Sequence, residues 1–171
     1  KNWVFHAFVL LYYSQILGVD PLLVSLALSL TMIIDAIADP WIGSFSDNLH
    51  TRWGRRHPLM ILGAVPLGVC FYAVFTPPGG LSHAQLFLWL AGFMVLTRIF
   101  LAVYFVPWVA IATELSDDYH ERTSIMAYRY AIGWLVALLF PFIIFTFVMT
   151  DSPDYPSGQL NPANYPTMAL M

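Results

Sequence analysis

Long apolar stretches separated by short polar segments dominate this sequence. Five of them, over residues 4–17, 22–45, 59–75, 85–112 and 124–150, are predicted to be membrane-spanning helices, the first shorter than the rest. A helix of about 20 residues crosses the roughly 30 Å of bilayer hydrocarbon. Because lipid offers no partner to unsatisfied backbone groups, the pattern predicts an all-α, polytopic transmembrane helix bundle.

The sequence changes character twice after the fifth stretch. Residues 151–166 are rich in Pro, Asn, Ser and Gly, which is typical of a loop. Residues 167–171 are apolar again and predict the start of a sixth span. Because the sequence also opens inside an apolar stretch, we expect it to be part of a longer membrane protein.

Positive charge is distributed unevenly among the predicted loops. Three arginines lie between the second and third stretches and Arg122 lies between the fourth and fifth, whereas the loops after the third and fifth stretches contain neither Lys nor Arg. Loops rich in Lys and Arg remain on the cytoplasmic side of a membrane. Loops 46–58 and 113–123 are therefore predicted to be cytoplasmic, and loop 151–166 external.

Composition supports lipid as the solvent and excludes several classes of function. Charged residues make up only 10% of the chain and hydrophobic residues 59%, whereas soluble domains carry roughly 25% charged residues. The net charge of −3 and the lack of a basic stripe argue against a nucleic-acid partner. Cys70, the single cysteine, allows no disulfide framework or metal cluster. Because no nucleophile is paired with a base, we expect no enzyme activity and no cofactor beyond an ion.

Two carboxylates lie inside the second predicted span. Asp35 and Asp39 are four residues apart, so their side chains share one helix face about one turn apart. Two carboxylates this close in a low dielectric require a proton or a cation between them. The pair is therefore predicted to be a cation-coupling site for sodium or a proton, and it is the only metal site expected. The alternative is an ion pair with an arginine that locks two helices together.

Arg98 is the candidate partner for that alternative. Asp35 and Arg98 lie equally far from the outer ends of their predicted spans, at a depth of roughly 20 Å. A salt bridge between them is therefore geometrically allowed, and a buried arginine without a partner would be costly.

Four other polar or aromatic residues are candidates for substrate binding. Arg129 either extends to the cytoplasmic interface or faces a central cavity and donates hydrogen bonds to sugar hydroxyls. His6 is either a polar cavity residue or a hydrogen-bonded residue at the interface. Tyr104 and Trp108 flank a proline, and their rings suit either stacking on a sugar or helix packing.

Three segments resemble a known family of transporters. They read DAIADPWIGSFSD over residues 35–47, TRWGRRHP over residues 51–58 and ELSDDYHERT over residues 114–123. Their content and spacing resemble the glycoside–pentoside–hexuronide:cation symporters, the melibiose-permease-like branch of the major facilitator superfamily. The resemblance covers essentially the whole sequence. It implies a twelve-helix fold in which residues 1–171 form an incomplete N-terminal transmembrane half-bundle, with the remaining C-terminal half as its partner.

The resemblance also implies roles for individual residues. Asp35 and Asp39 match the positions that bind the coupling cation in this branch, and Arg129 matches an arginine that contributes to sugar binding. Gly43 permits close approach of a neighbouring helix. The residues implied to form the cytoplasmic gate are Gly43, Asp47, Arg52, Gly54, Arg55, Arg56, Glu114, Asp118, Glu121 and Arg122.

The expected function is therefore cation- or proton-coupled symport of a sugar or glycoside by alternating access, in a bacterial inner membrane. Phe105 stands where this branch carries an acidic residue that serves the sugar, which suggests a substrate other than a galactoside. Two alternatives remain open. One is a carrier of lysolipids or other amphiphiles on the same fold, and the other is a membrane sensor that transports nothing.

Overall fold

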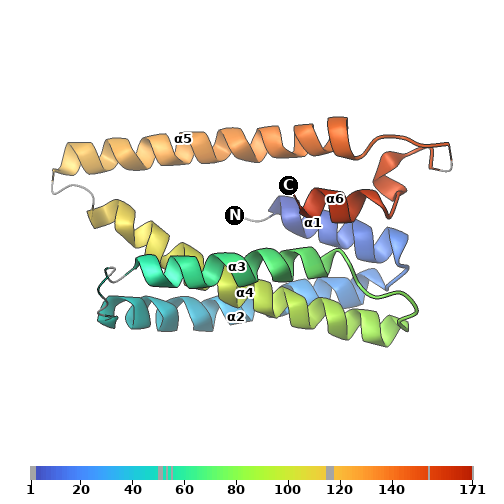
Figure 1. Cartoon of the computed structure of the whole chain (residues 1–171), viewed down its shortest axis with the longest axis horizontal. Helices are drawn as coiled ribbons and strands as arrows, with labels where there is room; N and C mark the ends of the chain where they lie inside the picture. The colour runs from blue at the N-terminus through green and yellow to red at the C-terminus, as the bar shows by residue number, and fades with distance from the viewer. Residues whose placement is uncertain are drawn as a thin grey trace.

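In this computed structural model the chain is a bundle of long helices, described over residues 3–49, 52, 54, 56–114, 118–153 and 155–170. The long helices are α1 (Trp3–Leu11), α2 (Pro21–Asn48), α3 (His57–Val74), α4 (His83–Glu114) and α5 (Tyr119–Ile143). π-Helical turns η1 (Tyr12–Ile16) and η2 (Ile144–Val148) extend α1 and α5, and η3 (Gly158–Leu160) precedes the short α6 (Asn164–Ala169). The described residues include no strand, so the fold is all-α (Figure 1).

Four helices of the described chain are long and apolar enough to cross a bilayer: α2, α3, α4 and α5 with its π-helical extension. A shorter apolar helix covers Val4–Ile16. Two helices begin at aspartates that cap free backbone N–H groups. Asp20 accepts from Leu22 N at 2.8 Å at the start of α2, and Asp118 accepts from the N–H groups of His120 and Glu121 at the start of α5. Such caps set where a helix begins.

The segment after α5 is more ordered than the loop predicted over residues 151–166. The N–H group of Gly158 donates to Asp151 Oδ1 at 2.9 Å, and Asn164 Nδ2 donates to the Gly158 carbonyl at 2.9 Å. A Cβ atom on Gly158 would overlap the backbone of Met149. Helix α6 also begins at Asn164, three residues before the sixth span predicted over residues 167–171. Local hydrogen bonds, which apolar patterning does not encode, account for this difference.

The hydrophobic core lies where η1, η2 and α6 meet the ends of α3 and α4. Tyr12 and Tyr165 have ring centroids 4.5 Å apart, and Phe75 stacks on Tyr165 at 6.0 Å. The Tyr13 hydroxyl donates to the Val74 carbonyl at 2.8 Å, so its one polar atom is satisfied. This aromatic cluster ties α6 to α1 and α3.

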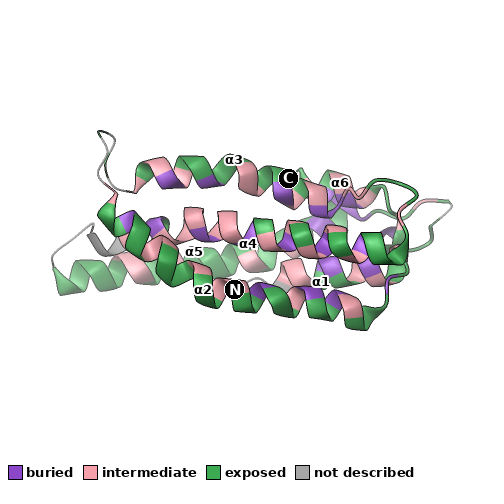
Figure 2. Cartoon of the chain, turned by 90° about the horizontal axis from the view of Figure 1, so that it is seen from below, coloured by how far each residue is buried: buried purple, intermediate pink, exposed green. Residues whose placement is uncertain are grey.

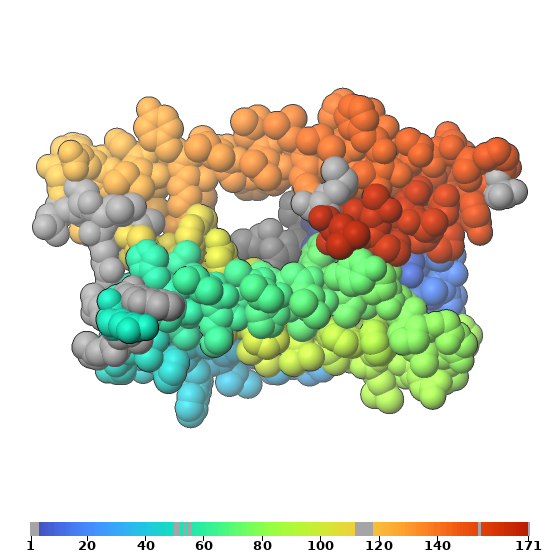
Figure 3. Space-filling model, in the orientation of Figure 1, coloured from blue at the N-terminus to red at the C-terminus, as the bar shows by residue number. Residues whose placement is uncertain are grey.

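Helix α4 packs along both α2 and α3, whereas α5 lies apart from them (Figure 1). No residue of α5 between Tyr119 and Ile143 is buried, and Figure 2 colours its visible length as exposed or intermediate. The space-filling view shows an open gap between α5 and the layer of α3 and α4 (Figure 3). Large apolar surfaces of α5 are therefore left uncovered by the rest of the described chain.

Candidate functional site

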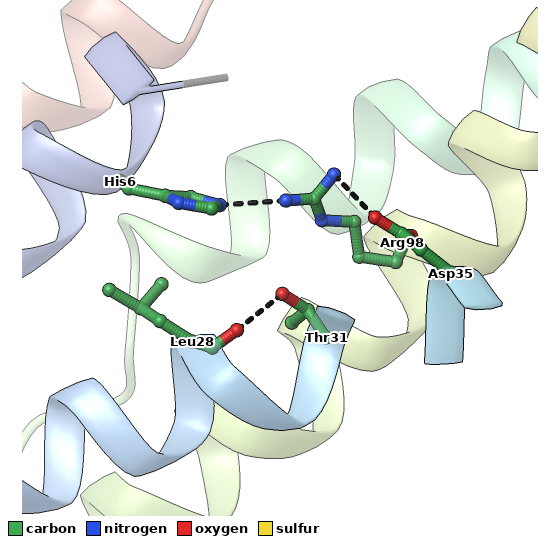
Figure 4. A network of polar contacts seen from close by, with 5 residues as sticks. All are labelled: His6, Leu28, Thr31, Asp35 and Arg98. Carbon is green, nitrogen blue, oxygen red and sulfur yellow. Dashed lines mark hydrogen bonds and ion pairs between the residues drawn. The ribbon is translucent and has the colours of Figure 1, made fainter. Parts of the chain in front are cut away.

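A polar network joins three helices in the middle of the bundle (Figure 4). Arg98 of α4 places Nη1 3.1 Å from Asp35 Oδ2 on α2, which is an ion pair. Its other terminal nitrogen, Nη2, lies 2.7 Å from Nε2 of His6 on α1. The ion pair anticipated from the equal depths of Asp35 and Arg98 is thus present, and the contact with His6 adds a third helix to it.

The chemistry of the groups fixes their roles in this network. A guanidinium only donates hydrogen bonds, so Nε2 of His6 must accept, and the imidazole is neutral with its proton on Nδ1. The Arg98 side chain is 9% exposed and that of Asp35 is 34% exposed. Thr31 lies nearby but donates to the Leu28 carbonyl at 2.6 Å, so its hydroxyl does not join the network.

Asp39 lies one turn beyond Asp35 on α2 and is exposed. The two carboxylates therefore differ in environment: Asp35 is partly buried against a cation, and Asp39 has access to its surroundings. The helix thus carries two carboxylates one turn apart, and Asp35 is the one paired with Arg98.

A cavity of about 470 Å³ lies beside Arg98, between α1, α3 and α4. Its walls are mostly apolar, and its polar side chains are Thr97, Arg98 and Tyr104. Tyr104, a predicted substrate residue, therefore lines the same cavity as Arg98. The remaining lining residues are Phe5, Ala64, Leu67, Gly68, Phe71 and Leu101.

A second cluster joins α4 and α5 around Arg129. The guanidinium carbon of Arg129 lies 3.9 Å from the centroid of the Trp108 ring and 6.0 Å from that of Phe105. Phe105 and Trp108 also contact each other, with centroids 5.4 Å apart. The Arg129 guanidinium therefore lies over the Trp108 ring, a stable arrangement for a cation, and two of the predicted substrate residues, Arg129 and Trp108, are in contact.

The predicted gate residues lie at the opposite end of the bundle from the aromatic core. Asp47 Oδ1 forms an ion pair with Arg56 Nη2 at 3.2 Å, and this pair links the end of α2 to the start of α3. Asp118 caps α5, and Glu121 and Arg122 are exposed in its first turn. Arg52 and Gly54 are exposed as well. Arg55 and the side chain of Glu114 lie outside the described residues.

The close helix approach predicted at Gly43 occurs elsewhere. A Cβ atom on Gly43 would lie 3.7 Å from Val106 Cγ1, an ordinary contact, so no close approach requires glycine there. At Gly63 of α3 it would lie 3.0 Å from Tyr104 N and 3.1 Å from Phe100 O, which is backbone. Sequence alone offers no signal that separates Gly63 from Gly68, whose Cβ position is open.

Sequence reasoning also missed the contact between His6 and Arg98. A histidine in an apolar stretch was the available signal, but the first stretch is shorter than the others, and apolar patterning alone does not give the depth of His6 within it. The comparison of depths that paired Asp35 with Arg98 therefore could not be extended to His6.

Comparisons with known proteins identify relatives of this sequence. The family model described as MFS/sugar transport protein matches residues 1–171. An uncharacterized symporter of Synechocystis sp. is 28% identical, covering 90% of this chain and 29% of the relative. A lactose permease of Leuconostoc lactis is 33% identical, covering 80% and 23%. An isoprimeverose transporter of Lactiplantibacillus pentosus is 24% identical, covering 77% and 27%. The chain thus spans less than a third of the length of these relatives.

Proposed function

This chain belongs to the MFS/sugar transport protein family, and we propose that the whole protein is a secondary active transporter, not an enzyme, that carries a sugar or glycoside by cation- or proton-coupled symport. The observation that carries the proposal is the carboxylate pair Asp35 and Asp39 on a membrane-length helix, with Arg98 buried against Asp35. Ionisable groups at membrane depth are costly and generally serve ion or substrate movement. Relatives named as a lactose permease and an isoprimeverose transporter support the substrate class.

The coupling step is assigned to Asp35 and Asp39. Arg98 pairs with Asp35, and a proton or cation that binds at the two carboxylates neutralises negative charge there. Neutralising that charge lowers the cost of closing the site off from water in the low-dielectric middle of the membrane. Ion binding therefore favours the change between outward-open and inward-open states, which couples the ion to the substrate.

Substrate binding is assigned to Arg129, Trp108 and Tyr104, together with His6, which belongs to the Arg98 network. The Arg129 guanidinium lies over the Trp108 ring, a contact that uses none of its N–H groups as hydrogen-bond donors to the ring edge. Those donors suit sugar hydroxyls, and an exposed aromatic face suits the apolar face of a pyranose ring. The remaining contacts would come from the C-terminal half that this chain does not include.

The membrane placement follows the distribution of arginine. Loops 46–58 and 113–123 are proposed to face the cytoplasm of a bacterial cell, with the protein in its inner membrane. The ion pair between Asp47 and Arg56 then lies at the cytoplasmic gate. The pair holds the end of α2 to the start of α3 and so fixes the geometry of the short connection between them at the proposed gate.

Uptake of a panel of radiolabelled sugars by vesicles holding the full-length protein tests the proposal. With a proton or sodium gradient imposed, we expect accumulation by the wild type and its loss in Asp39→Asn, while downhill exchange survives. Asp20→Asn is the matched control, because it removes a carboxylate from the same helix but asparagine caps equally well. Sugar movement indifferent to both gradients and to Asp39→Asn would contradict coupling at this pair.

A carrier of amphiphiles is the second candidate, and the cavity beside Arg98 is the observation that favours it. Its walls are mostly apolar, and one guanidinium lies among them. That combination suits an apolar chain with an anionic or hydroxylated head. Uptake of a labelled lysolipid by cells expressing the full protein, with no sugar uptake, would support this candidate against the sugar symporter.

A further inference from the structure

We propose that a polar hollow at the external end of α5 is a second binding site, which receives a neutral sugar before the sugar reaches Arg129. The hollow has a volume of about 430 Å³ and is lined by residues of η2, of η3 and of the connection between them, where the chain turns back toward α6 (Figure 1). The inference rests on the proposed function for the side of the membrane and the class of ligand. It goes beyond that function by assigning sugar binding to residues outside the Arg98 network and the Arg129 cluster.

Two threonine hydroxyls that line the hollow are left without a backbone partner. Hydroxyls in helices commonly donate to a carbonyl one turn earlier, and those of Thr31, Thr97 and Thr123 do so at 2.6 to 2.8 Å. Within the described chain, Thr146 and Thr150 make no such bond. Thr146 lies in the π-helical turn η2, and such turns frequently occur at functional sites. Both hydroxyls are therefore available to a ligand.

The opposite wall is formed by the chain as it folds back after η2. The N–H group of Gly158 donates to Asp151 Oδ1 at 2.9 Å, which fixes one oxygen of that carboxylate. A Cβ atom on Gly158 would overlap the backbone of Met149, so the chain can approach this closely only at a glycine. The close approach brings the side chains of Ser157 and Gln159 to the same hollow as the threonines.

This wall is anchored to the aromatic core behind it. Asn164 Nδ2 donates to the Gly158 carbonyl at 2.9 Å, and the Tyr165 hydroxyl donates to the Gln159 carbonyl at 2.8 Å. The Tyr165 side chain is fully buried in the core. The backbone that carries Ser157 and Gln159 is thus held in place without a ligand, and a preorganised site loses less entropy when it binds one.

The groups that line the hollow suit a neutral sugar. The side chains of Ser157 and Gln159 have no hydrogen-bond partner in the described chain, and hydroxyl and amide groups both donate and accept, as sugar hydroxyls do. Asp151 adds a carboxylate that accepts strong hydrogen bonds from hydroxyls and repels an anionic ligand. Phe145 supplies an aromatic ring for the apolar face of a pyranose. The volume falls within the range of roughly 300–1,000 Å³ found for ligand sites.

The hollow is separate from the Arg129 cluster. Thr146 lies seventeen residues beyond Arg129 on the continuous run of α5 and η2, roughly 25 Å along the helix axis. The start of α5 is the end proposed to face the cytoplasm, so the hollow lies at the external entrance. Binding there contributes to the KM for sugar taken up from outside and leaves the maximal rate unchanged.

Uptake by right-side-out vesicles holding the full-length protein tests the inference, with KM and maximal rate measured for radiolabelled glucose, xylose and lactose. We expect Thr150→Val and Asp151→Asn each to raise the KM roughly threefold to tenfold at an unchanged maximal rate, because each removes hydrogen bonding to the sugar. Asparagine still accepts from the Gly158 N–H group, so the wall keeps its fold. Thr76→Val is the matched control. Thr76 lies just after α3, outside the hollow, and donates to the Tyr72 carbonyl, so the KM should stay at the wild-type value.

Equilibrium dialysis of the same sugars with purified full-length protein shows whether the site is separate, and it requires no transport. Arg129→Gln removes the guanidinium of the other cluster, and we expect this protein to retain saturable sugar binding that the addition of Asp151→Asn weakens threefold or more.

Three results would overturn the inference. One is a wild-type KM in both Thr150→Val and Asp151→Asn. Another is a KM raised equally for uptake from outside and for efflux from inside, which is the sign of a structural effect. The third is an Arg129→Gln protein that binds none of these sugars, or binds them equally with and without Asp151→Asn. Failure of the proposed function appears separately, as wild-type vesicles that accumulate no sugar under any gradient, and the dialysis still decides the inference.

Discussion

Burying the charged side chain of Arg98 costs free energy, and its contacts with Asp35 and His6 offset that cost. Removing one partner of a buried ion pair generally destabilises a protein by about 3–5 kcal/mol, because the other charge is left uncompensated. The ion pair with Asp35 at 3.1 Å and the hydrogen bond to His6 at 2.7 Å are thus structural as well as functional contacts. The structural and the functional contribution of Arg98 can be distinguished only by variants that alter one of these contributions and leave the other in place.

His6 allows that separation, because its contribution depends on one acceptor atom. In His6→Leu the Nη2 group of Arg98 loses this acceptor, and we expect a loss of about 1–3 kcal/mol in stability. His6→Gln can present a carbonyl oxygen to the same group and should lose less. Thermal unfolding of the full-length protein in detergent measures both. Equal losses in the two variants would show that the ring packs against its neighbours and does not hold Arg98 by hydrogen bonding.

Two helices of the bundle, α3 and α4, approach closely at Gly63. A Cβ atom there would lie 3.0 Å and 3.1 Å from backbone atoms of α4, which do not yield as the end of a flexible side chain would. The position illustrates how small residues let membrane helices pack when lipid supplies no hydrophobic drive for their association. The contact holds α3 against the part of α4 that carries Tyr104.

Alanine substitutions on α3 test this contact directly. We expect Gly63→Ala to destabilise the protein by about 1–3 kcal/mol, the usual cost of overpacking a tight site. Gly68→Ala on the same helix is the control, because its Cβ position is open and alanine favours helix over glycine by about 1 kcal/mol. Denaturant unfolding in detergent compares the two. A Gly63→Ala protein as stable as Gly68→Ala would mean that α3 and α4 can separate without cost.

The molecule as a whole is an open bundle in which α5 stands apart. Arg129 contacts α4 through Trp108, and Phe145 of η2 stacks on Phe8 of α1 with centroids 5.5 Å apart. Between these contacts the space-filling view shows a gap (Figure 3). A helix with apolar residues exposed around it needs lipid or protein to cover them, and a second half-bundle would supply the protein.

Orientation in the membrane is a property of the whole molecule and can be measured on it. In a Cys70→Ser background of the full-length protein, we expect Ser157→Cys to react with a membrane-impermeant maleimide added to intact cells. Thr123→Cys should react only after the cells are opened, because it lies beside Arg122 at the start of α5, the end proposed to face the cytoplasm. Both positions are exposed. Labelling of Thr123→Cys from outside would reverse the proposed topology and place the Asp47–Arg56 pair at the external face.

The sequence by itself determined that the chain is all-α and built of long apolar helices, since the apolar runs that lipid requires are continuous along the chain. It also determined the family, through the segments that contain Asp35, Asp39 and the arginine-rich loop. Equal depth in two spans that run in the same direction allowed Asp35 and Arg98 to be named as possible partners, because helical rise is constant.

Only the tertiary structure decided which residues meet across helices. Rotation of each helix about its axis places His6 against Arg98, Arg129 on Trp108, and Gly63 against the backbone of α4. In lipid, apolar residues are favourable on every face, so the hydrophobic pattern that orients a helix in a soluble protein carries little information here. The facing sides are set by the packing of neighbouring side chains and by the few hydrogen bonds and ion pairs that must be satisfied between helices.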